Sequence, residues 1–245
     1  MDPDWIVPDW SVPSHVRAFF TTRAGGVSVG AYSSFNLGTT TDDDPAAVAA
    51  NRARLRTLLP QEPRWVKQVH GARVLEAEAV ASRPEADASI ALQRGTVCGI
   101  LVADCLPLLF SDLKGTIVAA AHAGWRGLAA GVIDNTVEAM TSKGVAPRDV
   151  LAWIGPGIGP AAFEVGDDVY EVYTQRDAGA SEAFRRHAPG KWLADLPWLA
   201  RRALTRAGVM HIYGGELCTW SDPRRFYSYR RDRLTGRMGA FIWRE

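Results

Sequence analysis

Short apolar runs in the middle of the chain predict buried strands. Residues 97–102 and 116–121 carry almost only apolar side chains over the length of a typical strand. On this pattern the LPLLF run at residues 106–110 extends the first strand. Further stretches with strand character are residues 66–69, 73–80, 209–213 and 239–243. The pattern predicts a sheet at the centre of the fold.

Helical patterns alternate with these strands. An acidic stretch that ends at Asp44 is followed by Pro45 and a run rich in alanine and leucine to Leu59, an order typical of a capped helix. A second helix is predicted over residues 127–140, directly after the second strand. A third is predicted over residues 196–207, where apolar side chains recur at helical spacing.

Strands and helices are interleaved, and the gaps between strands are short enough for antiparallel pairing. We therefore expect a mixed α/β structure with a central sheet, whose strand order the pattern does not fix. No internal repeat or linker-like change in composition divides the chain. One domain over residues 1–245 is the prediction.

Composition excludes several classes of protein. The 28 Lys and Arg nearly balance the 27 Asp and Glu, and a net charge of +1 argues against a general nucleic-acid surface. The acidic start is unlike a signal peptide, and the apolar stretch 97–110 is interrupted by Asp104 and too short to span a membrane. Three Cys favour a reducing compartment over a disulfide scaffold. We expect a cytoplasmic protein without nucleic-acid or membrane partners.

Three of the eight His and Cys residues lie in unusual settings. His70 and His122 each end a strand-like run, and Cys105 interrupts an apolar run. Active sites on sheets commonly lie at such strand ends. The spacing matches no zinc finger, but two His and one Cys are a known catalytic zinc set with a fourth position for water or substrate. The residues alone leave three alternatives: a shared metal site, a Cys105 nucleophile with a His122 base, or plain structural side chains.

Three turns that combine Gly or Tyr with Arg favour anion binding. Arg23 lies in TTRAGG, Arg126 in GWRG between a strand and a helix, and Arg230 in a Tyr- and Arg-rich stretch that continues to Arg237. Backbone N–H groups at a helix start and guanidinium groups both bind phosphate. Together the three turns favour a reaction that uses phosphate.

These residues also carry a family resemblance. From about Phe19 to Trp243 the chain contains, in order, TTRAGGVSVGAYSSFNLG, QVHG, ADCLPLL, HAGWRGL, IGPGIG and FYSYRRD followed by TGRM. This set resembles the YfiH-type laccase-domain family, also called multicopper polyphenol oxidases. The resemblance implies an α+β fold, a mixed β-sheet sandwich flanked by helices, similar to the cysteine-hydrolase class. It also implies metal ligands at His70, Cys105 and His122.

The resemblance further implies zinc-dependent purine nucleoside chemistry. Its reactions are phosphorolysis of adenosine, inosine, guanosine and methylthioadenosine, and deamination of adenosine. Zn²⁺ held by the three ligands would activate a water or a phosphate oxygen. Cys105 and His122 would form the catalytic centre, with Asp104 behind it or acting as a proton acceptor.

Substrate contacts are expected from five further side chains. Arg23, Arg126 and Arg230 would hold phosphate or balance its charge. Asn36 and Gln68 would orient the ribose or the ligand network. Purine nucleosides and phosphate are therefore the expected partners.

Three alternatives remain open. Some bacterial members of the family are linked to an amidase that removes wrongly incorporated serine from peptidoglycan precursors, and it would use the same metal or Cys site. Copper-dependent phenol oxidation is less favoured, because five His are too few for several copper centres. A structural zinc site in a binding protein would normally have four protein ligands, and the sequence offers no fourth His or Cys in a comparable setting.

Overall fold

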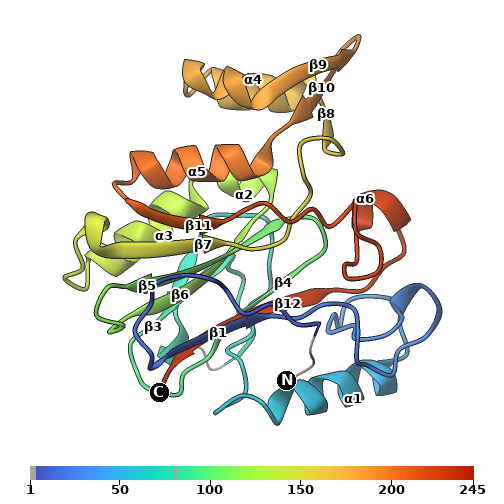
Figure 1. The fold of residues 1–245 in the computed structure, drawn as a ribbon, viewed down its shortest axis with the longest axis vertical. Coiled ribbons are helices and arrows are strands. Elements are labelled where there is room, and N and C mark those ends of the chain that lie inside the picture. Colours follow the sequence, from blue (N-terminus) through green and yellow to red (C-terminus); the bar gives the residue numbers. More distant parts are fainter. Residues whose placement is uncertain (1–3, 80–81) are drawn as a thin grey trace.

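Two β-sheets pack face to face in the computed structural model, which describes residues 4–79 and 82–245 (Figure 1). The smaller sheet is antiparallel, in the order β1 (Val16–Phe20), β12 (Met238–Arg244) and β4 (Cys98–Val102). The larger sheet has the order β11 (His211–Gly214), β7 (Val150–Ile154), β5 (Leu106–Asp112), β6 (Val118–Ala123), β3 (Ala88–Ala91) and β2 (Val74–Glu76). Apolar side chains from both sheets form the core between them, which makes the structure the expected mixed α+β sandwich.

Strand alternation divides the larger sheet into two apolar faces. In β5, Leu106, Leu108 and Phe110 point to one core, while Leu109 belongs to the core between the sheets. Its pairs are antiparallel except at the two edges, where β11 runs parallel to β7 and β2 runs parallel to β3.

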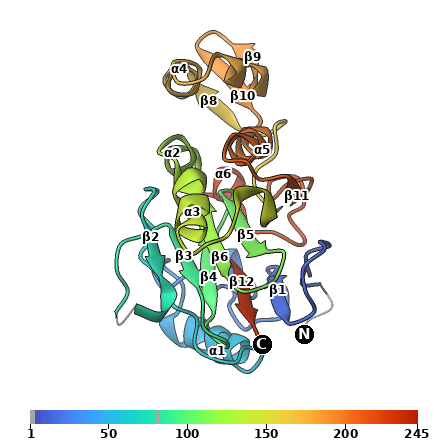
Figure 2. The same cartoon turned by 90° about the vertical axis from the view of Figure 1, so that its left-hand side faces the viewer.

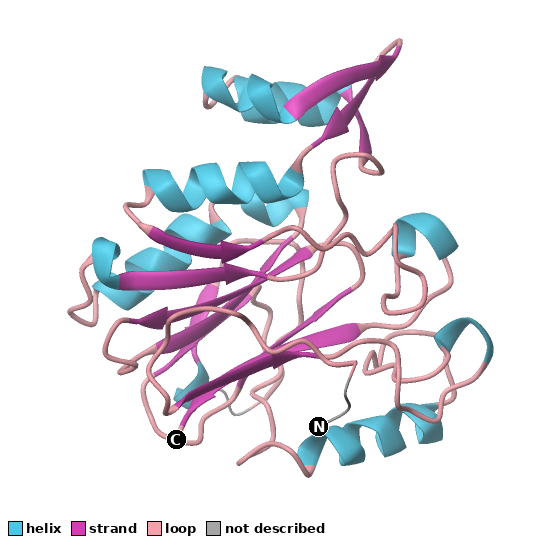
Figure 3. Cartoon of the chain, viewed as in Figure 1, coloured by secondary structure: helices cyan, strands magenta, loops and turns pink. Residues whose placement is uncertain are grey.

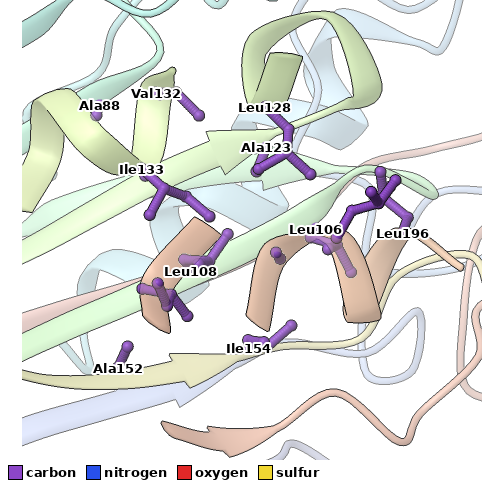
Figure 4. Close-up of a cluster of buried hydrophobic side chains, with 14 of the residues drawn as sticks. Ala88, Leu106, Leu108, Ala123, Leu128, Val132, Ile133, Ala152, Ile154 and Leu196 are labelled. Carbon is purple, nitrogen blue, oxygen red and sulfur yellow. The ribbon is translucent and has the colours of Figure 1, made fainter. Parts of the chain in front are cut away.

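Helices cover the outer face of the larger sheet. These are α2 (Trp125–Ala129), α3 (Val132–Thr141) and α5 (Leu196–Arg206). Figure 4 shows Val132, Ile133 and Leu196 among the sheet side chains Leu106 and Leu108. The amphipathic pattern that predicts the α5 helix is confirmed, since the apolar stripe of this helix packs on the sheet.

Helix α1 and a small lobe lie at opposite ends of the molecule. Helix α1 (Pro45–Arg56) lies near the smaller sheet, where Leu55 joins the core on its outer face, and Asp44 caps the helix by accepting from the Ala46 N–H. At the top of Figure 1 a lobe contains a third sheet, β8 (Glu164–Gly166), β10 (Lys191–Ala194) and β9 (Phe184–Ala188), with α4 (Asp167–Thr174). Figure 2 shows this lobe beyond α5, and Figure 3 shows the short helix α6 (Tyr229–Asp232) near the ends of the strands.

Two sequence predictions of element boundaries were wrong. The LPLLF run does not extend the preceding strand, because β4 and β5 belong to different sheets and the chain changes sheet at residues 103–105. Residues 127–140 form no single helix, because Gly131 has a φ of 92° and separates α2 from α3.

The predictions before β3 also need correction. Residues 66–69 form no strand, and Lys67 makes only an isolated bridge to Glu85. Of the predicted strand 73–80, only Val74–Glu76 is extended in a sheet, a 3₁₀ turn follows over Ala77–Ala79, and residue 80 lies outside the described residues. In the described part of the chain, no helix combines the length and apolar character that crossing a bilayer requires.

Candidate metal centre

Strand register brings the candidate ligands to one end of the larger sheet. Leu106 of β5 pairs with Ala123 of β6, so Cys105 lies beside the residues that follow His122. Ala88 of β3 pairs with Ala121 of β6, so Asp87 lies opposite His122. The His122 N–H donates to the Asp87 carbonyl at 2.7 Å and continues this register. Three strands separated in sequence therefore present a thiol, an imidazole and a carboxylate side by side.

His70 completes a group of three potential metal ligands. One ligand atom each from His70, Cys105 and His122 lies within 4.8 Å of the other two. The rings of the two His have centroids 4.8 Å apart at 69°. His122 is buried, Cys105 is half-buried and His70 is exposed, so the group opens to solvent on the His70 side.

Asp87 organises both imidazoles. Its carboxylate accepts from the ring Nδ1 of His122 at 2.8 Å, which leaves Nε2 of that ring as the ligand atom. The same carboxylate accepts from the backbone N–H groups of Val69, His70 and Gly71 at 3.1, 2.9 and 2.7 Å. Asp87 is fully buried, and it fixes one ligand directly and the other through its backbone.

Two residues of this region have left-handed backbone. His70 has a φ of 59° and Asp104 a φ of 87°, in a region that residues other than glycine rarely occupy. The three N–H bonds to Asp87 hold His70 in this conformation. The Asp104 carboxylate accepts from the Thr219 hydroxyl and from the Arg230 N–H, both at 2.6 Å. Such conformations persist where surrounding contacts determine them, and they cluster at functional sites.

The charges of the site favour an ionised thiol. Burial alone would raise the pKa of Cys105, but the charge of His122 and hydrogen bonds from His122 and His70 outweigh it and lower that pKa to about 6. Burial alone would lower the pKa of His122, but the Cys105 thiolate and Asp87 raise it to about 9. Burial would raise the pKa of Asp87, but its bonds from His122, Gly71 and Val69 hold it below the usual range.

The thiol of the metal-free protein should therefore react at low pH. We expect the rate of Cys105 alkylation by iodoacetamide to rise with pH through a midpoint of about 6 and to level off above it, because the thiolate is the nucleophile. Mass spectrometry of the labelled peptide measures this rate, and Cys105→Ser should lose this phase. A midpoint above pH 8 would show that His122 and His70 do not stabilise the thiolate of Cys105.

Because Gly124 has no side chain, the side chains of Cys105 and His70 can lie close to its backbone. A Cβ atom at this position would lie 2.7 Å from the Cys105 Sγ and 3.0 Å from the His70 Cδ2. Its φ of −70° and ψ of 164° suit alanine, so Gly124→Ala tests crowding rather than backbone strain. We expect the affinity of the site for a metal ion to fall by at least about 10-fold, with the fold retained by circular dichroism. Unchanged affinity in a chelator competition would show that the ligands do not need this space.

Asn36 and Gln68, which were predicted to orient the ribose or the ligand network, make hydrogen bonds within the protein. Asn36 is fully buried, donates to Thr41 and Asp43 at 3.0 Å, and accepts from the N–H of Gly38 and Arg237 at 2.9 and 2.8 Å. Gln68 exchanges two hydrogen bonds with the backbone of Leu101, at 2.8 and 2.9 Å. Both amides thus connect loops around the site to the sheets.

The three predicted phosphate arginines also have partners in the fold. Arg23 donates to the carbonyls of Ser33 and Pro223 at 2.8 and 2.9 Å. Arg230 donates to the Glu164 carbonyl at 2.5 Å. Arg126 is exposed, with its guanidinium 4.4 Å from the Trp125 ring centroid. Their phosphate role stays a prediction.

Sequence reasoning missed Asp87 and gave Arg237 no role of its own. Asp87 precedes the buried run of β3, and a lone acid in front of an apolar run was the available signal. Arg237 precedes β12, and the charges of Cys105 and Asp104 act on its guanidinium. The sequence placed Arg237 in a stretch that favours anion binding but gave no sign that the charge of Cys105 acts on its guanidinium.

Comparison with known proteins identifies the family of this chain. Residues 17–245 match the family described as multi-copper polyphenol oxidoreductase laccase. The chain belongs to this family. A Pseudomonas aeruginosa protein named purine nucleoside phosphorylase is 51% identical over 241 residues and covers 98% of both chains. The Escherichia coli purine nucleoside phosphorylase YfiH is 50% identical over 242 residues, which cover 97% of this chain and 98% of that protein.

Solved structures of the laccase-domain family have the same fold. The Neisseria meningitidis protein NMB0706 has a TM-score of 0.94 at 46% identity and covers 99% of both chains. YlmD of Geobacillus stearothermophilus has a TM-score of 0.86 at 35% identity, over 95% of this chain and 93% of that one. The resemblance to YfiH is confirmed, and the His-Cys-His group suggests a metal ion. The likeness to the cysteine-hydrolase class stays a prediction.

Proposed function

We propose that this protein is a zinc enzyme that splits purine nucleosides with phosphate and also deaminates adenosine. The group formed by His70, Cys105 and His122, with Asp87 behind it, carries the proposal. Relatives that match nearly the whole chain and are named purine nucleoside phosphorylases support the substrate class. Adenosine, inosine, guanosine and methylthioadenosine are the proposed nucleosides.

The donor set suits zinc. Zinc commonly binds thiolate sulfur and imidazole nitrogen, and the lowered pKa of Cys105 provides the thiolate. Among the described residues no further His, Cys or acid belongs to this ligand group, so a zinc ion held there would keep a position for water or substrate, as in catalytic sites. When bound there, zinc supplies a Lewis acid that polarises an oxygen nucleophile.

The residues of the chain position the reaction. In phosphorolysis a phosphate oxygen bonds to C1′ of the ribose while the C1′–N9 bond breaks, and the electron pair remains on the purine, which takes a proton. Asp87 holds His122 in one tautomer and one orientation during this step. Asp104 acts as a positioning residue for Cys105, since both carboxylate oxygens are occupied by Thr219 and Arg230.

Product analysis tests the proposal. Purified zinc-loaded protein incubated with inosine and phosphate should release hypoxanthine and ribose-1-phosphate in equal amounts, and adenosine should yield inosine and ammonia. Chromatography of both products measures the two reactions. Absence of turnover at full zinc occupancy would reject the proposed activity.

Amide hydrolysis is the second candidate, because the Cys105 and His122 charges resemble a nucleophile and its partner. A metal-free Cys–His hydrolase would keep its activity after chelation and lose it on alkylation of Cys105. Loss of activity on chelation, with recovery on zinc addition, excludes that form. An amidase that uses the metal is then tested with peptidoglycan precursors.

A further inference from the structure

Within the part of the chain that the structure describes, Arg237 presents a guanidinium edge without a protein partner, and the charges of Cys105 and Asp104 act on this guanidinium. Its Nη1 donates to the carbonyls of Thr235 and Gly236 at 3.0 Å, and its backbone N–H donates to Asn36 at 2.8 Å. Gly38 packs against its stem, since a Cβ there would lie 2.8 Å from the Arg237 Cγ. In residues 4–79 and 82–245, its Nε and Nη2 donate to no protein atom. The side chain is therefore fixed at one nitrogen and free at two.

This guanidinium has no carboxylate partner within ion-pair distance among the described residues. It is half-buried, and burial lowers its pKa, while the charges of Cys105 and Asp104 act in the opposite direction. Arginine stays protonated in proteins, so the site contains a partly desolvated cation. Such a group is stabilised by an anion that completes its hydrogen bonds.

Two hydroxyl groups nearby have unused hydrogen-bonding capacity. The hydroxyls of Tyr32 and Thr235 are buried and make no hydrogen bond in the described structure. Tyr32 acts electrostatically on the Arg237 guanidinium, and the Thr235 carbonyl accepts from it. Buried polar groups are almost always satisfied, so these two point to a polar ligand or water beside Arg237.

We infer that Arg237 is the residue that binds the phosphate co-substrate, through the free Nε and Nη2 edge. This inference rests on the proposed function and refines it. Arg23 has both Nε and Nη1 on backbone carbonyls, and Arg126 is exposed over Trp125. Arg230 lies over the Phe163 ring, whereas the charges of Cys105 and Asp104 act on the Arg237 guanidinium. The two parallel N–H donors of a guanidinium can each donate to one phosphate oxygen. A single point charge does not provide this two-point fit. A phosphate bound there would lie within the electrostatic reach of Cys105 and Asp104, whose charges act on the same guanidinium.

Phosphate binding and kinetics test this assignment. Calorimetric titration of zinc-loaded Arg237→Met with inorganic phosphate should show a dissociation constant raised about 10- to 100-fold, the loss expected for a charged hydrogen-bonding partner. The KM for phosphate should rise similarly, while adenosine deamination, which consumes water, stays largely unchanged. Arg237→Lys keeps the charge and loses the fork, so its phosphate affinity should lie between those of Arg237→Met and the wild type.

Two further arginine variants complete the design. Arg17→Met removes the same charge from an exposed ion pair with Glu245 and should bind phosphate as the wild type does. Wild-type phosphate affinity in both Arg237 variants, or a larger loss in Arg126→Met, would overturn the assignment. A wild type that binds phosphate through Arg237 but splits no nucleoside would reject the proposed function and retain this site.

Discussion

Replacing Cys105 with serine is expected to remove zinc and to lower inosine phosphorolysis by more than the roughly 100-fold that changes behind a metal site cost. The hydroxyl of serine does not ionise near neutral pH. The Cys105 thiol, whose pKa is lowered to about 6, does ionise and supplies a thiolate ligand. Metal analysis by mass spectrometry and the initial rate with inosine and phosphate measure the two effects.

Cys218→Ser is the matched control for this substitution. Cys218 is also a free, half-buried thiol, and its sulfur accepts from the Gly159 N–H and the Ser221 hydroxyl at 3.2 Å. We expect this variant to keep its zinc and its rate. A Cys105→Ser protein that is folded by circular dichroism and retains stoichiometric zinc would contradict the assignment of Cys105 as a ligand.

Replacing Asp87 with asparagine should weaken both the site and the fold. The amide presents a donor group to a shell made of three backbone N–H groups and the His122 ring, so at least one donor loses its acceptor. We expect zinc affinity and activity to fall about 10- to 100-fold. The free energy of unfolding of the metal-free protein should fall by about 1–3 kcal/mol. Chelator competition and urea unfolding measure these changes.

Glu85→Gln provides the comparison for Asp87→Asn. Glu85 lies two residues earlier, is exposed, and pairs with Lys67 at 2.8 Å. Exposed pairs contribute little, so its effect on stability should stay within about 1 kcal/mol and zinc binding should not change. Equal effects of the two substitutions would show that Asp87 does not organise the ligands.

Local signals explain why part of the fold was predictable. The Asp44 cap and the proline that opens α1, the apolar stripe of α5 and the apolar runs of β4 and β6 are properties of adjacent residues, and the structure confirms them. The change of sheet between β4 and β5 depends instead on the left-handed Asp104, whose conformation is held by Thr219 and Arg230, far away in sequence. No pattern within a short window contains that information.

The residues of the site also differ in whether local sequence predicts them. His70, Cys105 and His122 stand out because each ends or interrupts an apolar run. Asp87 has its role only through the register of β3 against β6, which the sequence pattern leaves open. Asn36 and Gln68 hydrogen-bond to backbone partners that only the folded chain brings near, which no sequence pattern shows. Their role in orienting the ribose or the ligand network stays a prediction.

The most direct test of this account measures zinc and activity together in wild-type protein and the His70→Ala variant, both without affinity tags. His70 is the exposed member of the group, so its removal should disturb the fold least. The account predicts one zinc per wild-type chain, phosphorolysis of inosine, and loss of both in His70→Ala. Full zinc content and full activity in the variant would contradict it.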